Sequence, residues 1–211
     1  MDVDGRSLVW HATRRLLDAG VDHVVILVDP SDGEAAAEVA ADPILGGAVS
    51  VLTSGPDRPG SLPWETASTG GAPDVLLVHD ATRAFAPVAM VHRVVGAVRA
   101  GAGLVIPVLP VVDTIRAVGD GGRASALVDR DTLRIVQTPQ GYTPDVFRRA
   151  RHAADRLTDP AAAVAAGATP VTVPGHADAS RVLTVADIDQ ARRALGATPP
   201  PPAPGGADIR G

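Results

Sequence analysis

The stretch Val75-Leu76-Leu77-Val78-His79-Asp80-Ala81-Thr82-Arg83 decides the fold class of this chain. Its four leading apolar residues are typical of a parallel strand, because such strands are covered on both faces. Asp80 follows almost directly after this strand, and Arg83 comes three residues later. Open α/β sheets bind ligands at the carboxyl ends of their strands, so we expect an anion and a cation around one crevice there. A carboxylate and a guanidinium suit a site for a metal ion and a phosphate.

Around this strand, short apolar segments alternate with helical patterns. This alternation predicts an α/β protein with a mostly parallel sheet and helices on both faces. We expect further strands at residues 24–28, 49–52, 104–108 and 169–173, and helices at 8–18, 34–41, 88–100, 144–154 and 184–195.

Residues 110–140 interrupt the alternation. Glycines at 119, 121 and 122 mark a turn between two partly alternating segments, which predicts a β-hairpin arm protruding from the sheet. Because a lone two-stranded ribbon is marginally stable in water, we expect the arm to clasp a second subunit in a homodimer. The domain is expected to cover residues 1–197, followed by a disordered Pro/Gly-rich tail at 198–211.

The composition argues against several classes of function. The formal net charge of −5 over 211 residues argues against a nucleic-acid-binding surface. Cysteine is absent, which excludes disulfides and thiolate metal sites and fits a reducing cytoplasm. No apolar run approaches the roughly 18 residues of a membrane span, and the acidic N-terminal residues are unlike a signal peptide. We therefore expect a cytoplasmic protein without nucleic acid or membrane as a partner.

Further motifs accompany the His-Asp strand along the chain. They are Gly5-Arg6-Ser7-Leu8, the loop from Ser54 to Leu62, Asp113-Thr114-Ile115-Arg116, Asp129-Arg130, Gln137-Thr138-Pro139-Gln140, Thr158-Asp159 and Arg181-Val182. From residue 5 to residue 195 the series resembles the 2-C-methyl-D-erythritol 4-phosphate cytidylyltransferases of isoprenoid precursor synthesis, and less closely the ribitol-phosphate cytidylyltransferases. The resemblance implies a Rossmann-like sheet and transfer of CMP from CTP to a sugar-alcohol phosphate, with release of pyrophosphate and with Mg²⁺ as the cofactor.

The resemblance also implies roles for residues of the core. Asp80 matches an aspartate beside the metal and the reacting phosphates, and Arg83 matches an arginine that helps hold the sugar phosphate. Ser61 matches a serine near the cytidine. Nucleotidyl transfer needs positioning and charge neutralisation more than covalent chemistry, so these residue types suit it. We interpret His79 as structural, because this chemistry needs no base there.

Five other residues match family positions that contact substrate. Thr114 and Arg130 match arm residues that reach a partner subunit's active site. Alternatively, Asp113-Thr114 simply starts a turn, and Arg130 forms a surface ion pair with Asp129 or Asp131. Thr138 matches a threonine that lines the substrate pocket, and Thr158 matches the threonine of a Thr-Asp-Glu-Ala motif. Arg181 stands where the family usually has a substrate-binding lysine, which keeps the charge but changes its geometry.

Some family features are missing from this sequence. The family begins with a strand and a glycine-rich loop, which cradles the CTP triphosphate, and then a Pro-Lys pair. Here Met1 lies four residues before Gly5, so we expect the chain as written to have little activity. Two explanations remain open: a start codon assigned too far downstream, or a non-catalytic paralogue. A nucleotidyltransferase with another substrate is a third interpretation. Loss of a central strand would expose two rows of backbone groups, which favours the first.

Overall fold

Strand β6 (Leu104–Pro110) lies inside the main sheet. The computed structural model describes residues 2–53, 73–151 and 160–196. In that part of the chain the strand order is β11–β6–β10–β5, and β9 pairs with the end of β6. These strands are β5 (Leu76–Val78), β9 (Arg134–Val136), β10 (Gln140–Tyr142) and β11 (Pro170–Pro174). β5, β6 and β11 run in one direction, because β11 is parallel to β6 while β10 is antiparallel to both β5 and β6.

Strand β10 corrects one sequence-based expectation. The arm predicted from the break in alternation extends to Gln140, and no strand is expected at residues 140–142. The structure instead inserts these residues between β5 and β6, so the pairings in the main sheet are mixed and not mostly parallel. Gly141 makes this possible, since a Cβ atom there would lie 2.6 Å from Cγ1 of Val94 and 2.8 Å from Cγ2 of Val98 on the covering helix.

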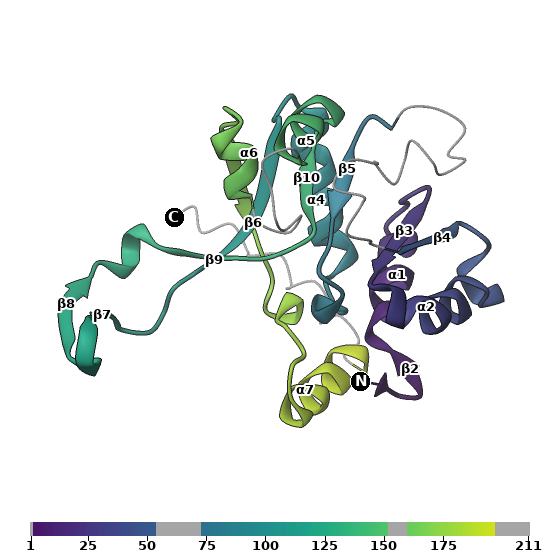
Figure 1. Ribbon diagram of the computed structural model, residues 1–211, viewed down its shortest axis with the longest axis horizontal. Helices are drawn as coiled ribbons and strands as arrows, with labels where there is room; N and C mark the ends of the chain where they lie inside the picture. Colours follow the sequence, from purple (N-terminus) through teal and green to yellow (C-terminus); the bar gives the residue numbers. More distant parts are fainter. Residues whose placement is uncertain (1, 54–72, 152–159, 197–211) are drawn as a thin grey trace, which may run out of the picture.

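Helices cover both faces of the main sheet, as expected (Figure 1). On one face, α4 (Val88–Arg99) packs against Val105. On the other, α5 (Pro144–Arg151) and α6 (Ala161–Ala165) pack against Leu104. Neighbouring residues of a strand point to opposite faces, so β6 contributes to both layers of the core. The predicted Rossmann-like α/β fold is confirmed.

A second, two-stranded sheet lies beside the first. It consists of β3 (Val24–Val28) and β4 (Val49–Thr53), which are parallel. Helix α1 (Leu8–Asp18) precedes β3, and the Ser7 hydroxyl caps it by accepting a hydrogen bond from the Trp10 amide. The remaining helices and strands of this part are β1 (Asp2–Val3), β2 (Arg6–Ser7), α2 (Gly33–Ala40) and α7 (Val185–Gly196).

The protruding arm is present. Its hairpin consists of β7 (Ile115–Val118) and β8 (Ala124–Val128), and it projects away from the main sheet (Figure 1). Gly121 and Gly122 have φ angles of 77° and 73°, which explains the glycines at the turn. Within the described residues, no helix is long and apolar enough to cross a membrane.

Candidate functional site

Asp80 lies at the carboxyl end of β5, where the sequence placed it. Its Oδ1 atom accepts hydrogen bonds from the Thr82 amide (3.0 Å) and the Thr82 hydroxyl (2.7 Å), which caps the short 3₁₀ helix η3 (Ala81–Arg83). Arg181, 101 residues away in sequence, donates from Nε to Oδ2 of Asp80 at 3.0 Å. The structure therefore brings together an expected metal ligand and an expected substrate cation.

The surroundings of Asp80 favour its charged form. Partial burial alone would raise the pKa of this carboxyl group, but the hydrogen bonds from Thr82 and the charge of Arg181 outweigh that effect and lower it. Asp80 is therefore a carboxylate at neutral pH. Its side chain keeps 17% exposure, and that of Arg181 keeps 47%, so solvent reaches the pair.

Thr138 fixes the backbone of Asp80 from the neighbouring strand end. The Thr138 Oγ1 atom accepts from the Asp80 amide at 3.0 Å and lies 2.9 Å from Nδ1 of His79. Loss of hydration lowers the pKa of His79 to about 4, so the ring is neutral at pH 7. The Thr138 hydroxyl can donate to Nδ1 or accept from it, and the His79 tautomer decides which. Thr138 is buried, so its visible role is to hold the turn.

Arg83 is buried, which sequence reasoning did not anticipate. Its guanidinium donates from Nη1 to the Ala179 carbonyl (2.7 Å) and from Nη2 to the Val136 carbonyl (3.1 Å). Its Nε is the single buried side-chain nitrogen or oxygen without a hydrogen-bond partner among the described residues. Loss of hydration, then the charge of Arg181, lowers its pKa. The observed contacts join two walls of the site.

Gln137 is a functional candidate that we did not single out from the sequence. Its buried side-chain amide donates to the His176 carbonyl (2.8 Å) and accepts from the His176 amide (2.9 Å). At Gly175 a Cβ atom would lie 2.2 Å from Oε1 of Gln137, so glycine is required for this approach. The contact anchors the segment that leads to Arg181. Its position next to Thr138 in the Gln-Thr-Pro-Gln motif was the available signal.

The other expected site residues lie elsewhere. Thr114 precedes β7 and Arg130 follows β8, so both belong to the arm, which projects away from β5 (Figure 1). Arg130 donates from Nη1 to the Val112 carbonyl. The structure does not bring these two residues to Asp80 within one chain. Ser61 and Thr158 lie outside the described residues, as does the predicted tail at 198–211.

The side chains of this site suit a metal ion that is also bound by substrate phosphates better than one bound by protein side chains alone. Across residues 2–53, 73–151 and 160–196, no three His, Asp or Glu side chains gather closely enough to hold a metal ion. Mg²⁺ commonly binds one or two carboxylates and completes its shell with water and substrate phosphates. Asp80, which is charged and partly exposed, is suited to that arrangement.

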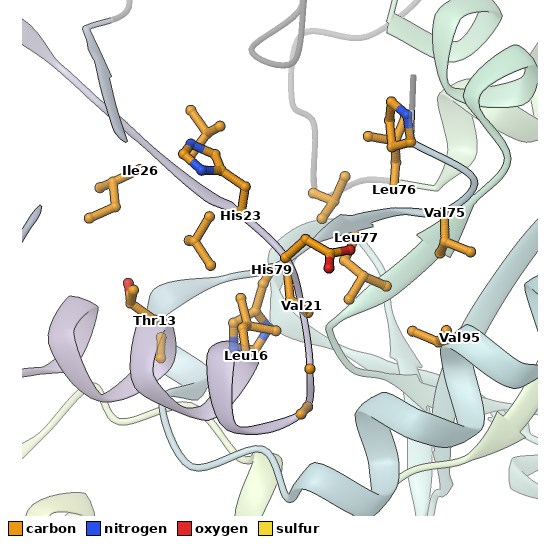
Figure 2. A pocket seen from close by; sticks show the side chains of 18 of the residues that line it. Thr13, Leu16, Val21, His23, Ile26, Val75, Leu76, Leu77, His79 and Val95 are labelled. Atoms are coloured by element: carbon orange, nitrogen blue, oxygen red, sulfur yellow. The ribbon is translucent and has the colours of Figure 1, made fainter. Parts of the chain in front are cut away.

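A large cavity of about 1110 Å³ adjoins this site. It lies between β3 and β5 and extends to His79 and Ala81. Figure 2 shows Leu16 and Thr13 from α1 on one side of it, with Ile26 and Leu77 from the two strands. We call this cavity the slot.

Known proteins share both the sequence and the fold. A family model described as 2-C-methyl-D-erythritol 4-phosphate cytidylyltransferase matches residues 1–197. A protein of that name from Saccharopolyspora erythraea is 43% identical over 200 residues, 92% of this chain and 88% of the relative. One from Nocardia farcinica is 39% identical over 196 residues, 92% of this chain and 83% of the relative. The crystal structure of the Thermus thermophilus enzyme of the same name superposes with a TM-score of 0.70 at 27% identity, covering 93% of this chain and 92% of that one.

Proposed function

Because this chain belongs to the 2-C-methyl-D-erythritol 4-phosphate cytidylyltransferase family, we propose that Asp80 and Arg181 form the centre of its nucleotidyl transfer site. The family reaction transfers CMP from CTP to 2-C-methyl-D-erythritol 4-phosphate in isoprenoid precursor synthesis and releases pyrophosphate. The observation that carries the proposal is the 3.0 Å contact between Arg181 Nε and Asp80 Oδ2 at the carboxyl end of β5. Ligands of α/β sheets bind at this edge.

Charge neutralisation is what this reaction needs most from the protein, because its phosphates are highly charged. Asp80 would hold Mg²⁺ through a carboxylate oxygen, and the bound ion would neutralise and orient phosphate oxygens. The exposed guanidinium of Arg181 is placed to contact the phosphate of the sugar alcohol. Arginine presents several donors in one plane, which suits a phosphate.

Thr138 and Arg83 serve this site by positioning other groups. Thr138 holds the Asp80 backbone through its hydroxyl. Arg83 joins the segment before Thr138 to the segment before Arg181 through the Val136 and Ala179 carbonyls. Because these contacts hold the site from both segments, its charged groups are already in place and need not rearrange at the moment of reaction.

The arm supports a homodimer as part of this proposal. Val118 on β7 is 66% exposed and Leu127 on β8 is 63% exposed, so the hairpin presents apolar surface. Covering such surface is favourable. We place Thr114 and Arg130 of one subunit near the substrate of the other. We also propose a cytoplasmic location, and the absence of cysteine is consistent with it.

Replacing Asp80 by asparagine tests the site. In a protein that also carries the family's N-terminal glycine-rich loop, the variant keeps the shape but removes the charge that would bind the metal. There, kcat/KM for CTP-dependent pyrophosphate release should fall at least tenfold, or about 1.4 kcal/mol. The matched control is Asp74→Asn, because Asp74 lies before the same strand and forms a comparable pair with Arg99 at 2.8 Å. Its kcat/KM should stay near that of the parent. Full activity of Asp80→Asn at limiting Mg²⁺ would show that the site is elsewhere.

A further inference from the structure

Residues 175–182 carry Arg181 to Asp80, and we call this segment the strap. It follows strand β11 and contains one short 3₁₀ helix, η6 (Ala177–Ala179). None of these described residues lines the slot, so the strap is separate from that cavity. Because the strap forms little regular secondary structure, its backbone groups need partners elsewhere in the chain, and those partners decide where Arg181 lies.

The strap leaves the sheet beside Gln137. The Gly175 amide donates to the Val108 carbonyl at 2.8 Å, which continues the pairing of β11 with β6. One residue later, the Gln137 side chain donates to the His176 carbonyl at 2.8 Å and accepts from the His176 amide at 2.9 Å. Bonds to both backbone groups of one residue fix its orientation as well as its position. Gln137 is 1% exposed, so loss of these bonds would leave buried groups unsatisfied.

The anchored residue in turn holds the next turn of the strap. The His176 ring accepts from the Asp178 amide through Nδ1 at 3.1 Å and so caps η6. This short helix ends at Ala179, whose carbonyl accepts from Arg83 at 2.7 Å. The hold of Gln137 on His176 therefore reaches the residues that directly precede Arg181.

A separate contact holds the strap after Arg181. The Val182 amide donates to the Thr82 carbonyl at 2.8 Å, and Val182 is buried. A segment that is held at one end only can pivot about that end. The strap is instead held on both sides of Arg181, and Gln137 provides the anchor at its entry.

Two adjacent residues hold the two partners of the charge pair. Thr138 accepts from the Asp80 amide at 3.0 Å, and Gln137 holds the strap that carries Arg181. One short segment therefore sets the position of the carboxylate relative to the guanidinium. Hydrogen bonds weaken steeply as their geometry worsens, so a small shift of the strap would weaken this pair.

We propose that Gln137 is a positioning residue, whose side chain holds the strap so that Arg181 pairs with Asp80 and faces the phosphate of the sugar alcohol. The last part rests on the proposed function of Arg181. Gly175 is the complement of Gln137, because a Cβ atom there would lie 2.2 Å from Gln137 Oε1. Gln137 acts through the strap and needs no contact with substrate.

NMR of arginine side chains tests the proposal on the 211-residue protein without catalysis. The parent should show a slowly exchanging Nε–H signal from Arg181, identified by its loss in Arg181→Lys. Gln137→Met keeps the length of the side chain but removes both hydrogen bonds to His176, so this signal should be lost to exchange with water.

The matched control is Gln140→Met. Gln140 is also fully buried, and its side chain accepts from the Tyr142 hydroxyl at 2.7 Å within β10. The same substitution there should lower the stability of the protein as well, because it also removes a buried hydrogen bond. The Arg181 signal should remain.

Gly175→Ala perturbs the same contact from the side of the strap, and it carries the test if Gln137→Met does not fold. The added methyl group would displace the Gln137 side chain, so the Arg181 signal should again be lost. The variant with both changes should resemble either single variant, since effects on one shared contact are not additive.

Steady-state kinetics then separate positioning from loss of stability, in a protein that also carries the family's N-terminal glycine-rich loop. Gln137→Met should raise KM for 2-C-methyl-D-erythritol 4-phosphate at least about fivefold and change KM for CTP by less than about twofold. Gln140→Met should change neither KM, because its effect is confined to stability.

An Arg181 signal that is unchanged in both Gln137→Met and Gly175→Ala would overturn the proposal. Loss of the signal in Gln140→Met would overturn it too, since the effect would then follow from stability alone. If Gln137→Met loses the signal while KM for the sugar-alcohol phosphate stays unchanged, Gln137 does position the pair. The proposed contact of Arg181 with the phosphate would then be refuted instead.

Discussion

Thr138 provides the sharpest test of how the site is built. Its hydroxyl accepts from the Asp80 amide at 3.0 Å and contacts His79 Nδ1 at 2.9 Å. Thr138→Val replaces the hydroxyl by a methyl group of similar size, so little cavity is made and the loss is confined to these two hydrogen bonds. Leaving a buried polar group unsatisfied costs roughly 1–3 kcal/mol. Since Asp80 and His79 are only partly buried, water can replace some of the lost contacts, and we expect about 2 kcal/mol in total.

Urea unfolding measures this cost directly. The midpoint for Thr138→Val should fall at an unchanged m value, since the surface exposed on unfolding is the same. Thr138→Ser keeps the hydroxyl and should recover most of the loss. Thr132→Val is the control, because it removes a hydroxyl that donates to the Asp129 carbonyl on the exposed arm.

Activity separates positioning from simple destabilisation. In a protein that also carries the N-terminal glycine-rich loop, a looser Asp80 turn should lower kcat more than it raises KM for CTP, and Thr138→Ser should restore kcat. The reasoning is refuted if Thr138→Val lies within about 0.5 kcal/mol of the parent protein, the usual range for surface changes.

Three further outcomes follow from the structure. The pKa of His79 is about 4 in the folded protein and near 6.5 in the unfolded chain, so the unfolded chain binds a proton first as pH falls. The free energy of unfolding should therefore decrease as pH drops from 6.5 towards 4. His79→Asn should reduce this pH dependence, and an unchanged dependence would contradict the assignment. Gly141→Ala should cost about 1–3 kcal/mol by overpacking against Val94, with relief in a Val94→Ala background; equal costs in both backgrounds would exclude that contact as the cause. The protein should sediment as a dimer, and replacing residues 115–128 with a tight turn should give a monomer; a monomeric parent at high micromolar concentration would refute the arm-mediated dimer.

Local patterns in the sequence were sufficient to predict most of the elements. The strand at 24–28 and the helix at 8–18 are found as expected, because an apolar run and a 3.6-residue period are local properties. The position of Asp80 after β5 also follows from the chain itself. So does the protruding hairpin, whose turn requires glycines with positive φ.

Only the tertiary structure decided which distant groups meet. Arg181 reaches Asp80 across 101 residues, and Gln137 holds the segment at His176 through its side chain. Arg83 is buried because the two carbonyls that it binds come from segments 53 and 96 residues away. Strand β10 has no recognisable pattern, since its pairing depends on two flanking strands and on a glycine that lets α4 approach. Such contacts arise from how whole elements pack, so the local propensity and periodicity of one stretch do not identify its partner.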